Sequence, residues 1–166
     1  GTALSGTLHP GQYYLVQMAS GGGDGMSLPT PDAVGRVSMS WSGAKVILVN
    51  TTSGLACNGG SVPCTPDHLD KIVDLVGWGD ANFFEGTCGP ETGRTTAVLR
   101  RVDGHRETDD NGADFSVEEP NPRNTAHARN LDLPSVSIAA PAADEVLTGA
   151  ATTISGLASD QGGSVA

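Results

Sequence analysis

Glycine and proline interrupt this chain so often that long regular elements have no room to form. The 166 residues include 23 Gly and 10 Pro, and no segment has the apolar periodicity of a helix longer than two turns. Short β-branched runs between such breaks are typical of strands in a sandwich or barrel. The sequence therefore predicts an all-β fold.

Six segments before residue 118 have the alternation or the β-branched content of strands. They are residues 13–18, 36–41, 45–50, 72–78, 95–102 and 113–117. Because Ser42 and Gly43 form a short turn signal between the second and third segments, we expect these two to pair as a hairpin. The fourth segment is almost continuously apolar, which predicts burial on both faces; its Asp74 is either paired or marks an edge.

Two further segments are expected to lie between the strands. Thr65 followed by Pro66 is typical of a helix N-cap, so residues 66–71 are expected to form one or two helical turns. Residues 19–32 hold many Gly and Pro and are predicted to be a long exposed loop.

The composition changes near residue 130. Residues 131–166 contain four acids and no Lys or Arg, whereas the preceding part contains 15 acids and all nine bases. Short alternating runs at 136–138, 146–148 and 152–155 follow the change. We therefore expect a first domain at 1–129, a linker at 130–135 and the truncated beginning of a second β domain at 136–166.

The charge excludes several classes of partner. A formal net charge of −10 disfavours direct non-specific binding to nucleic acid and to anionic lipid. No apolar run is long enough to span a membrane, and the start has no signal-peptide pattern. Since the first residue is Gly1 and the end has no terminating feature, we expect a fragment of a longer protein.

Cys57 and Cys64 bracket a polar, Gly-rich hexapeptide that cannot order itself by packing. A disulfide is the favoured interpretation, with free thiols or a metal site as alternatives, because no second ligand pair has metal spacing. A disulfide here would indicate an oxidising, extracytoplasmic location. Cys88 is then left without a partner in this chain.

Several motifs in a fixed order resemble the bacterial lamin-tail domain. They are PGQYYLVQ at 10–17, LPTPD at 28–32, KVILVN at 45–50, IVDLVGWG at 72–79, NFFEG at 82–86, TDDNGADF at 108–115 and PNPRN at 120–124. The resemblance covers about residues 4–126 and lacks the family's first strands. The tail from residue 134 resembles, more weakly, the first strands of a bacterial immunoglobulin-like repeat.

The resemblance implies an immunoglobulin-like β-sandwich of the lamin-tail type in a secreted or cell-surface bacterial protein. The implied function is that of a non-catalytic module for binding, adhesion or spacing, with a protein or a cell-surface molecule as its ligand. The alternative is the accessory domain of an extracellular nuclease or phosphatase of the endonuclease/exonuclease/phosphatase family, whose catalytic domain lies outside this chain.

The residues themselves indicate no catalytic site and no cofactor motif. The nucleophile, zinc-protease and phosphate-loop patterns are absent, and His9, His68, His105 and His127 share no spacing. Residues 21–25 are Gly-rich but do not lead into a helix. Arg100 and Arg101 are adjacent on a predicted strand and are expected to point to opposite faces.

One segment has the spacing of a calcium loop. Glu107, Asp109 and Asn111 occupy loop positions 1, 3 and 5, Gly112 occupies position 6 and Glu118 occupies position 12. Strands are expected on both sides where the motif requires helices, so an Asx-rich turn is favoured over a calcium site.

The aromatic residues allow two interpretations. Trp41, Trp78, Phe83 and Phe84 could form a ligand platform, but only 4% of the residues are aromatic. A small domain first needs such side chains in its core, so a core role is favoured.

Overall fold

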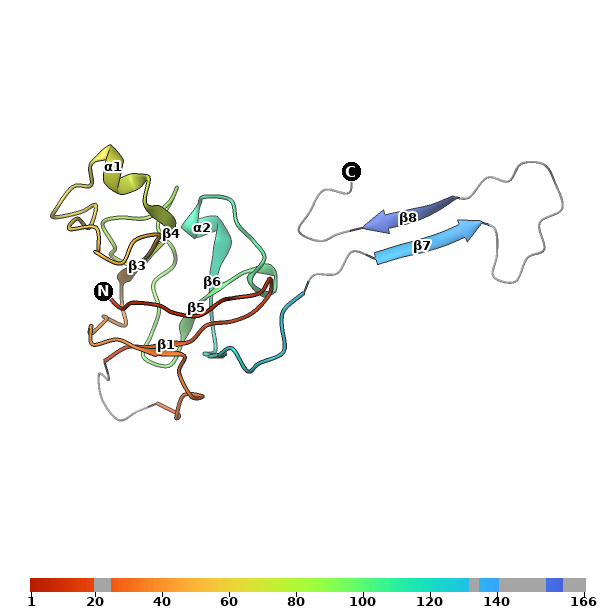
Figure 1. Ribbon diagram of the computed structural model, residues 1–166, viewed down its shortest axis with the longest axis horizontal. Helices are drawn as coiled ribbons and strands as arrows, with labels where there is room; N and C mark the ends of the chain where they lie inside the picture. Colours follow the sequence, from red (N-terminus) through yellow and green to blue (C-terminus); the bar gives the residue numbers. More distant parts are fainter. Residues whose placement is uncertain (20–24, 132–134, 141–154, 160–166) are drawn as a thin grey trace. The chain divides into compact units, whose positions relative to one another are not determined.

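The computed structural model describes residues 1–19, 25–131, 135–140 and 155–159 (Figure 1). The chain divides into two compact units, Gly1–Arg129 and Asn130–Ala166. This division coincides with the change of composition at residue 130.

The first unit is β-rich and is built from small two-stranded sheets. Its strands are β1 (Val16–Gln17), β2 (Ala33–Val34), β3 (Ala44–Val49), β4 (Ile72–Trp78), β5 (Ala97–Arg100) and β6 (Phe115–Glu118). Between them lie the short helices α1 (Pro66–Leu69), η1 (Val102–Gly104) and α2 (Asn111–Asp114). Among the described residues no helix exceeds four residues, which confirms the expectation of a β-rich chain without long helices.

The longest strand pair joins β3 and β4, which run antiparallel. In its register Val46 lies opposite Val76 and Ala44 lies opposite Trp78. Because side chains alternate along a strand, these four share one face of the sheet. Ile47 and Leu75 are paired on the other face.

The predicted hairpin of residues 36–41 with residues 45–50 is wrong. Residues 36–41 form no strand, and β3 pairs with the distant β4 instead. Backbone carbonyls of residues 36–41 accept hydrogen bonds from other segments. The carbonyl of Val37 accepts from the N–H of Ala19 at 3.2 Å, and the carbonyl of Trp41 accepts from the Thr92 hydroxyl. The alternating pattern of residues 36–41 therefore does not mark a strand.

Segments from far along the sequence complete the other edge of β4. The Asn111 side chain accepts a hydrogen bond from the Gly77 N–H at 2.8 Å and donates one to the Leu75 carbonyl at 3.0 Å. Gly89 continues the edge, donating to the Gly77 carbonyl at 2.9 Å and accepting from the Gly79 N–H at 3.0 Å. Since Asn111 offers both a donor and an acceptor, its amide takes the place of a neighbouring strand's backbone.

The two edges of the β3–β4 sheet therefore differ. Every second residue of β3 directs its N–H and C=O away from β4. Within the described residues, no backbone group of another segment pairs with this outer edge of β3.

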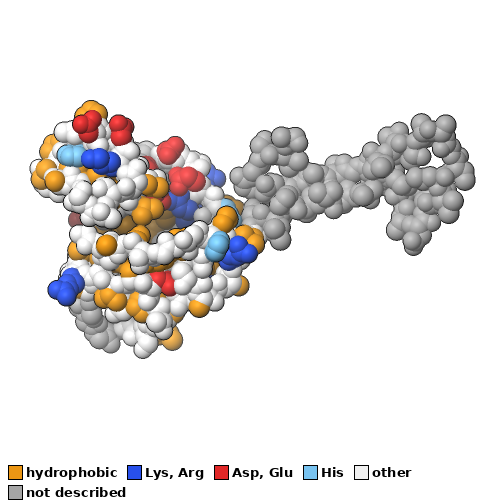
Figure 2. Space-filling model, in the orientation of Figure 1, with side chains coloured by type: hydrophobic (Ala, Val, Ile, Leu, Met, Phe, Trp, Pro, Cys, Tyr) orange, Lys and Arg blue, Asp and Glu red, His pale blue; other side chains and the backbone are white. Residues whose placement is uncertain are grey.

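The apolar core of the first unit is small. Leu55, Leu75 and Phe115 are its buried apolar side chains among the described residues, at 8%, 4% and 7% exposure. The expectation that β4 is buried on both faces is wrong, because Val73 is 60% exposed. Hydrophobic side chains are accordingly visible over much of the face shown in Figure 2.

The strands β5 and β6 run antiparallel, with Arg100 opposite Phe115. The strand predicted at 95–102 ends earlier because Val102 and Asp103 have left-handed φ angles of 53° and 51°. Arg100 pairs with Asp74 at 3.2 Å, which settles the two alternatives for Asp74 in favour of a paired carboxylate. Helix α2 precedes β6 directly and packs against β4 and β6 (Figure 1).

Helix α1 follows a disulfide-closed loop. Cys57 and Cys64 are bonded, with Cα atoms 5.2 Å apart. Pro66 begins α1 and Thr65 is its N-cap, as the sequence predicted. The Lys45 ammonium links this loop to β3 by donating to the Asn58 carbonyl at 2.6 Å. It also donates to Asn82 Oδ1 at 2.7 Å.

The described part of the second unit is an antiparallel pair of strands, β7 (Ser135–Ala140) and β8 (Ser155–Ser159). β7 includes the strand predicted at 136–138. The strand predicted at 146–148, most of the one at 152–155, residues 132–134 of the linker and most of the glycine-rich run 21–25 lie outside the described residues. Across the described segments no helix has the length and hydropathy of a membrane span.

Replacement of Asn111 by alanine should destabilise the first unit. The change leaves the buried Gly77 N–H and Leu75 carbonyl without partners, so we expect a loss of about 2–4 kcal/mol in the free energy of unfolding. Both tryptophans lie in the first unit, so urea unfolding followed by tryptophan fluorescence measures this unit alone. The matched control is Asn121→Ala at an exposed asparagine, with an expected change within about 0.5 kcal/mol. Equal changes in both variants would contradict the edge-completing role of Asn111.

Loss of the Cys57–Cys64 bond should lower stability by roughly 2–3 kcal/mol, the chain-entropy estimate for a loop this short. The measurement is the urea midpoint of the Cys57→Ser/Cys64→Ser variant and of the reduced parent chain. Cys88→Ser is the control, and the oxidised parent should show one thiol that reacts with a thiol reagent after unfolding. Three reactive thiols in the untreated chain would contradict the bond.

Candidate ligand-binding pocket

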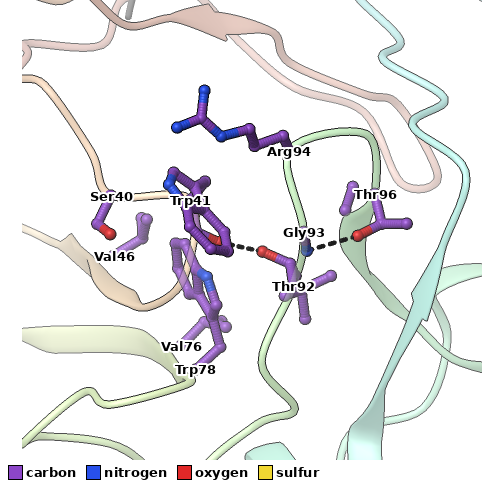
Figure 3. Close-up of a pocket in the computed structure, with 11 residues that line it drawn as sticks. Ser40, Trp41, Val46, Val76, Trp78, Thr92, Gly93, Arg94 and Thr96 are labelled. Carbon is purple, nitrogen blue, oxygen red and sulfur yellow. Dashed lines mark hydrogen bonds between the residues drawn. The ribbon is translucent and has the colours of Figure 1, made fainter.

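A pocket of about 500 Å³ opens beside the β3–β4 sheet (Figure 3). Its apolar wall is made of Val46, Val76 and Trp78, which the register places on the same face of the sheet. Trp41 adds a second indole from the segment just before β3, and Val98 lines the opposite side from β5. Volumes of this order are typical of small-molecule sites.

A long-range hydrogen bond sets the shape of the pocket. The Thr92 hydroxyl donates to the carbonyl of Trp41, so two segments that are 51 residues apart are joined at the rim (Figure 3). The next residue, Gly93, donates its N–H to the Thr96 hydroxyl at 2.7 Å. This turn carries Arg94 over the Trp41 ring, with 5.8 Å between the guanidinium carbon and the ring centre.

Glycine is required where the Trp41 segment meets the end of β4. Gly79 has a φ of +64°, and a Cβ there would collide with the carbonyl oxygen of Ser42. Because a side chain is excluded on both grounds, the chain around residue 42 can approach β4 closely. That approach holds Trp41 beside Trp78.

The preference for the aromatic residues as core is wrong. Trp41 is 51% exposed and Phe84 is 37% exposed, whereas Trp78 and Phe83 are partly exposed. The physical reason is the use of residues 36–41 by other segments, which leaves Trp41 at the surface instead of inside a hairpin. Two of the four aromatic residues, Trp41 and Trp78, line the pocket.

In the structure, Glu107, Asn111 and Glu118 of the proposed calcium loop each bind a different partner. Glu107 forms an ion pair with Arg100, and Glu118 accepts from the Ser116 hydroxyl at 2.6 Å. Asn111 is 1% exposed, and its amide oxygen already accepts from the N–H groups of Gly77 and Glu85. Within the described ranges no three His, Cys, Asp or Glu side chains are grouped so that they could hold a metal ion.

The acids of the same segment bind backbone instead. Asp110 caps α2 by accepting from the N–H groups of Gly112 and Ala113, and it also accepts from both the N–H and the hydroxyl of Thr87. The bonds from Thr87 lower the pKa of Asp110. The segment is thus an Asx-type turn built on hydrogen bonds.

Asp114 is fully buried and forms an ion pair with Arg106 at 3.3 Å. Burial alone would raise the pKa of Asp114, but hydrogen bonds from the N–H and hydroxyl of Thr108 lower it below its ordinary value. In Glu85 the opposite occurs: burial, together with the charge of Asp74, raises the pKa of this carboxyl.

The remaining candidate residues have local roles. Nδ1 of His68 accepts from the Thr65 N–H at 3.4 Å, and Nδ1 of His127 accepts from the Asn124 N–H at 3.3 Å. Burial raises the pKa of the Cys88 thiol, whose sulfur lies 3.3 Å from the Gly79 carbonyl. A raised pKa keeps the thiol protonated, and a protonated thiol is a weak nucleophile.

The sequence provided no signal for Thr92 and Arg94 as pocket residues. Both belong to a short Gly-containing turn that contacts Trp41 through the Thr92 hydrogen bond and through Arg94 over the ring, 51 or more residues along the chain. Comparison of the chain with protein-family models, with curated proteins and with solved structures returned no match. The role of the pocket therefore has to be argued from its own chemistry.

Acid should unfold the first unit through three carboxyls. The folded-state pKa values of Asp32, Asp110 and Asp114 lie below the ordinary value of 3.8; for Asp32 the cause is hydrogen bonds from the Leu15 N–H and from Thr125. The unfolded chain then binds more protons, so their stabilisation is present above that value and is lost as the pH falls through the lowered values. Glu85 acts in the opposite sense, since its raised pKa makes stability fall as the pH rises from 4.5 through the raised value.

The measurement is the urea midpoint as a function of pH, from neutral pH into acid. Asp110→Asn should lower the midpoint at neutral pH and flatten the acid limb. Glu119→Gln is the control, because Glu119 is exposed at the end of β6. An acid limb that keeps its slope in Asp110→Asn would show that other groups govern acid unfolding.

Proposed function

We propose that the Gly1–Arg129 unit is a non-catalytic binding module of a larger secreted or cell-surface bacterial protein. In this proposal it has the immunoglobulin-like sandwich of lamin-tail domains, and the second unit begins an immunoglobulin-like repeat. The antiparallel pairs β3–β4 and β5–β6 are consistent with such a fold, whereas β1 and β2 pair in parallel. The Cys57–Cys64 bond supports an oxidising compartment.

The observation that carries the proposal is the pocket with two indoles. Exposed tryptophan is enriched at binding surfaces because its rigid ring buries a large area at small entropic cost. Trp41 is half exposed although the unit has few aromatic residues to spare. A protein or a cell-surface molecule is therefore the ligand class that we propose.

The hydrogen bonds of the acidic side chains support a non-catalytic role. A general acid or base needs a carboxyl or imidazole directed at a substrate. Asp32, Asp110 and Asp114, the carboxyls with lowered pKa, each accept hydrogen bonds from backbone N–H groups. Their perturbed pKa values are explained by these structural bonds.

The proposal predicts that the chain binds to bacterial cell envelopes through Trp41. A labelled chain is sedimented with isolated envelopes, and the bound fraction is measured against chain concentration. Truncation of a central aromatic contact commonly weakens binding at least about tenfold, so Trp41→Ala should lose at least that much affinity. Phe84→Ala is the matched control, because Phe84 is an exposed aromatic residue outside the pocket.

Two results would contradict the proposal. One is an equal effect, or no effect, of the two substitutions on envelope binding. The other is hydrolysis of plasmid DNA or of a phosphomonoester by the isolated chain with Mg²⁺, Mn²⁺ or Ca²⁺, which would place catalysis within this chain.

A further inference from the structure

Arg94 lines the pocket and has no acidic partner among the described residues. The ion pairs of the described residues involve Arg100 and Arg106. Arg94 instead lies over the Trp41 ring, and its side chain is exposed. Its guanidinium donors are therefore available to a ligand that reaches the indole.

No carboxylate lines the pocket, although the chain contains 19 acidic residues. In the face shown in Figure 2, most acidic side chains gather toward the end where α1 and α2 lie. A planar guanidinium that forms no ion pair within the described residues matches the two oxygens of a ligand carboxylate. The charge of this site thus favours an anionic ligand over a neutral or cationic one.

Two hydroxyl groups at the rim have complementary capacity left. The Thr96 oxygen accepts from the Gly93 N–H, so its own O–H remains free to donate. The Thr92 O–H is used by the Trp41 carbonyl, so its oxygen can still accept, although Thr92 is only 9% exposed. A ligand with hydroxyl groups can satisfy both.

The pocket is a partly open hollow that is mostly apolar. Trp41 and Trp78 offer aromatic rings, and valines fill the wall between the strands (Figure 3). Such a surface suits a ring with one apolar C–H face whose hydroxylated edge stays in water. A fully apolar ligand would leave its outer side exposed and would not use Arg94.

We infer that the pocket binds a uronic acid residue of an acidic polysaccharide. This inference rests on the proposed binding function and names its ligand class. The sugar ring lies against the indoles, its carboxylate pairs with Arg94, and its hydroxyls contact Thr92 and Thr96. The net charge of −10 opposes a polyanion at long range, but salt limits that repulsion to a Debye length of about 8 Å at physiological ionic strength.

The test uses the full chain and oligomers of galacturonic acid, titrated by tryptophan fluorescence and calorimetry. The comparison ligand is the same oligomer with its carboxyl groups reduced to alcohols. A hydrogen-bonded charge pair is lost in the reduced ligand, so we expect it to bind at least about tenfold more weakly. Arg94→Gln should weaken binding of the acidic oligomer by a similar factor and leave the weak binding of the reduced oligomer unchanged.

Control variants separate this site from general charge effects. Arg36→Gln removes the same charge from an exposed arginine outside the pocket and should leave the affinity within about twofold. Trp41→Ala should abolish binding of both oligomers. Indole-3-acetate, an aromatic acid without hydroxyl groups, should bind at least about tenfold more weakly than the uronate.

Four results would overturn the inference: equal affinity for acidic and reduced oligomers, unchanged affinity in Arg94→Gln, equal or tighter binding of indole-3-acetate, or no binding of the uronate. If envelope binding still depends on Trp41 in any of these cases, the binding function stands and only the ligand class is wrong. If envelope binding is also insensitive to Trp41, the proposed function fails as well.

Discussion

The side-chain amide of Asn111 is the interaction on which the arrangement of the first unit depends. It contacts the backbone of Leu75 and Gly77 in β4, and it also accepts from the Glu85 N–H at 3.2 Å and donates to Glu85 Oε2 at 3.2 Å. One residue thereby joins the central strand, the segment after it and helix α2. All four hydrogen-bonding positions of the amide are occupied, so no similar side chain replaces it without leaving buried groups unpaired.

The first unit combines this hydrogen-bond network with a small apolar core. Its buried apolar side chains among the described residues are Leu55, Leu75 and Phe115, while Asn111 and Asp114 are the most deeply buried side chains. Hydrogen bonds supply the directional part of the fold, and the face of the β3–β4 sheet with Val46 stays at the surface. Because this face of the sheet is not covered by a larger core, the pocket between the two indoles is accessible.

Local features were predictable from the sequence, and long-range ones were not. The helix start at Thr65 and Pro66 and the extents of β3 and β4 follow from capping and β-branched runs within a few residues. The hairpin failed because its turn signal is weaker than the pairing of β3 with β4, which depends on segments about 30 residues apart. Asn111 looked like a calcium ligand because spacing alone does not reveal that its amide is buried. The pocket could not be predicted from local patterns either, because it depends on the contact of Thr92 with Trp41, which are 51 residues apart.

The two edges of the β3–β4 sheet differ in how far their backbone groups are already hydrogen-bonded. On one side, Asn111 and Gly89 occupy the outward backbone groups between Leu75 and Gly79. On the other side the outward backbone groups of alternate β3 residues have no backbone partner within the described structure. Lys45, a residue type that often protects such an edge, is bonded to Asn58 and Asn82. Within this sheet, the edge at Ala44–Val49 is therefore the one whose backbone groups could extend the ladder.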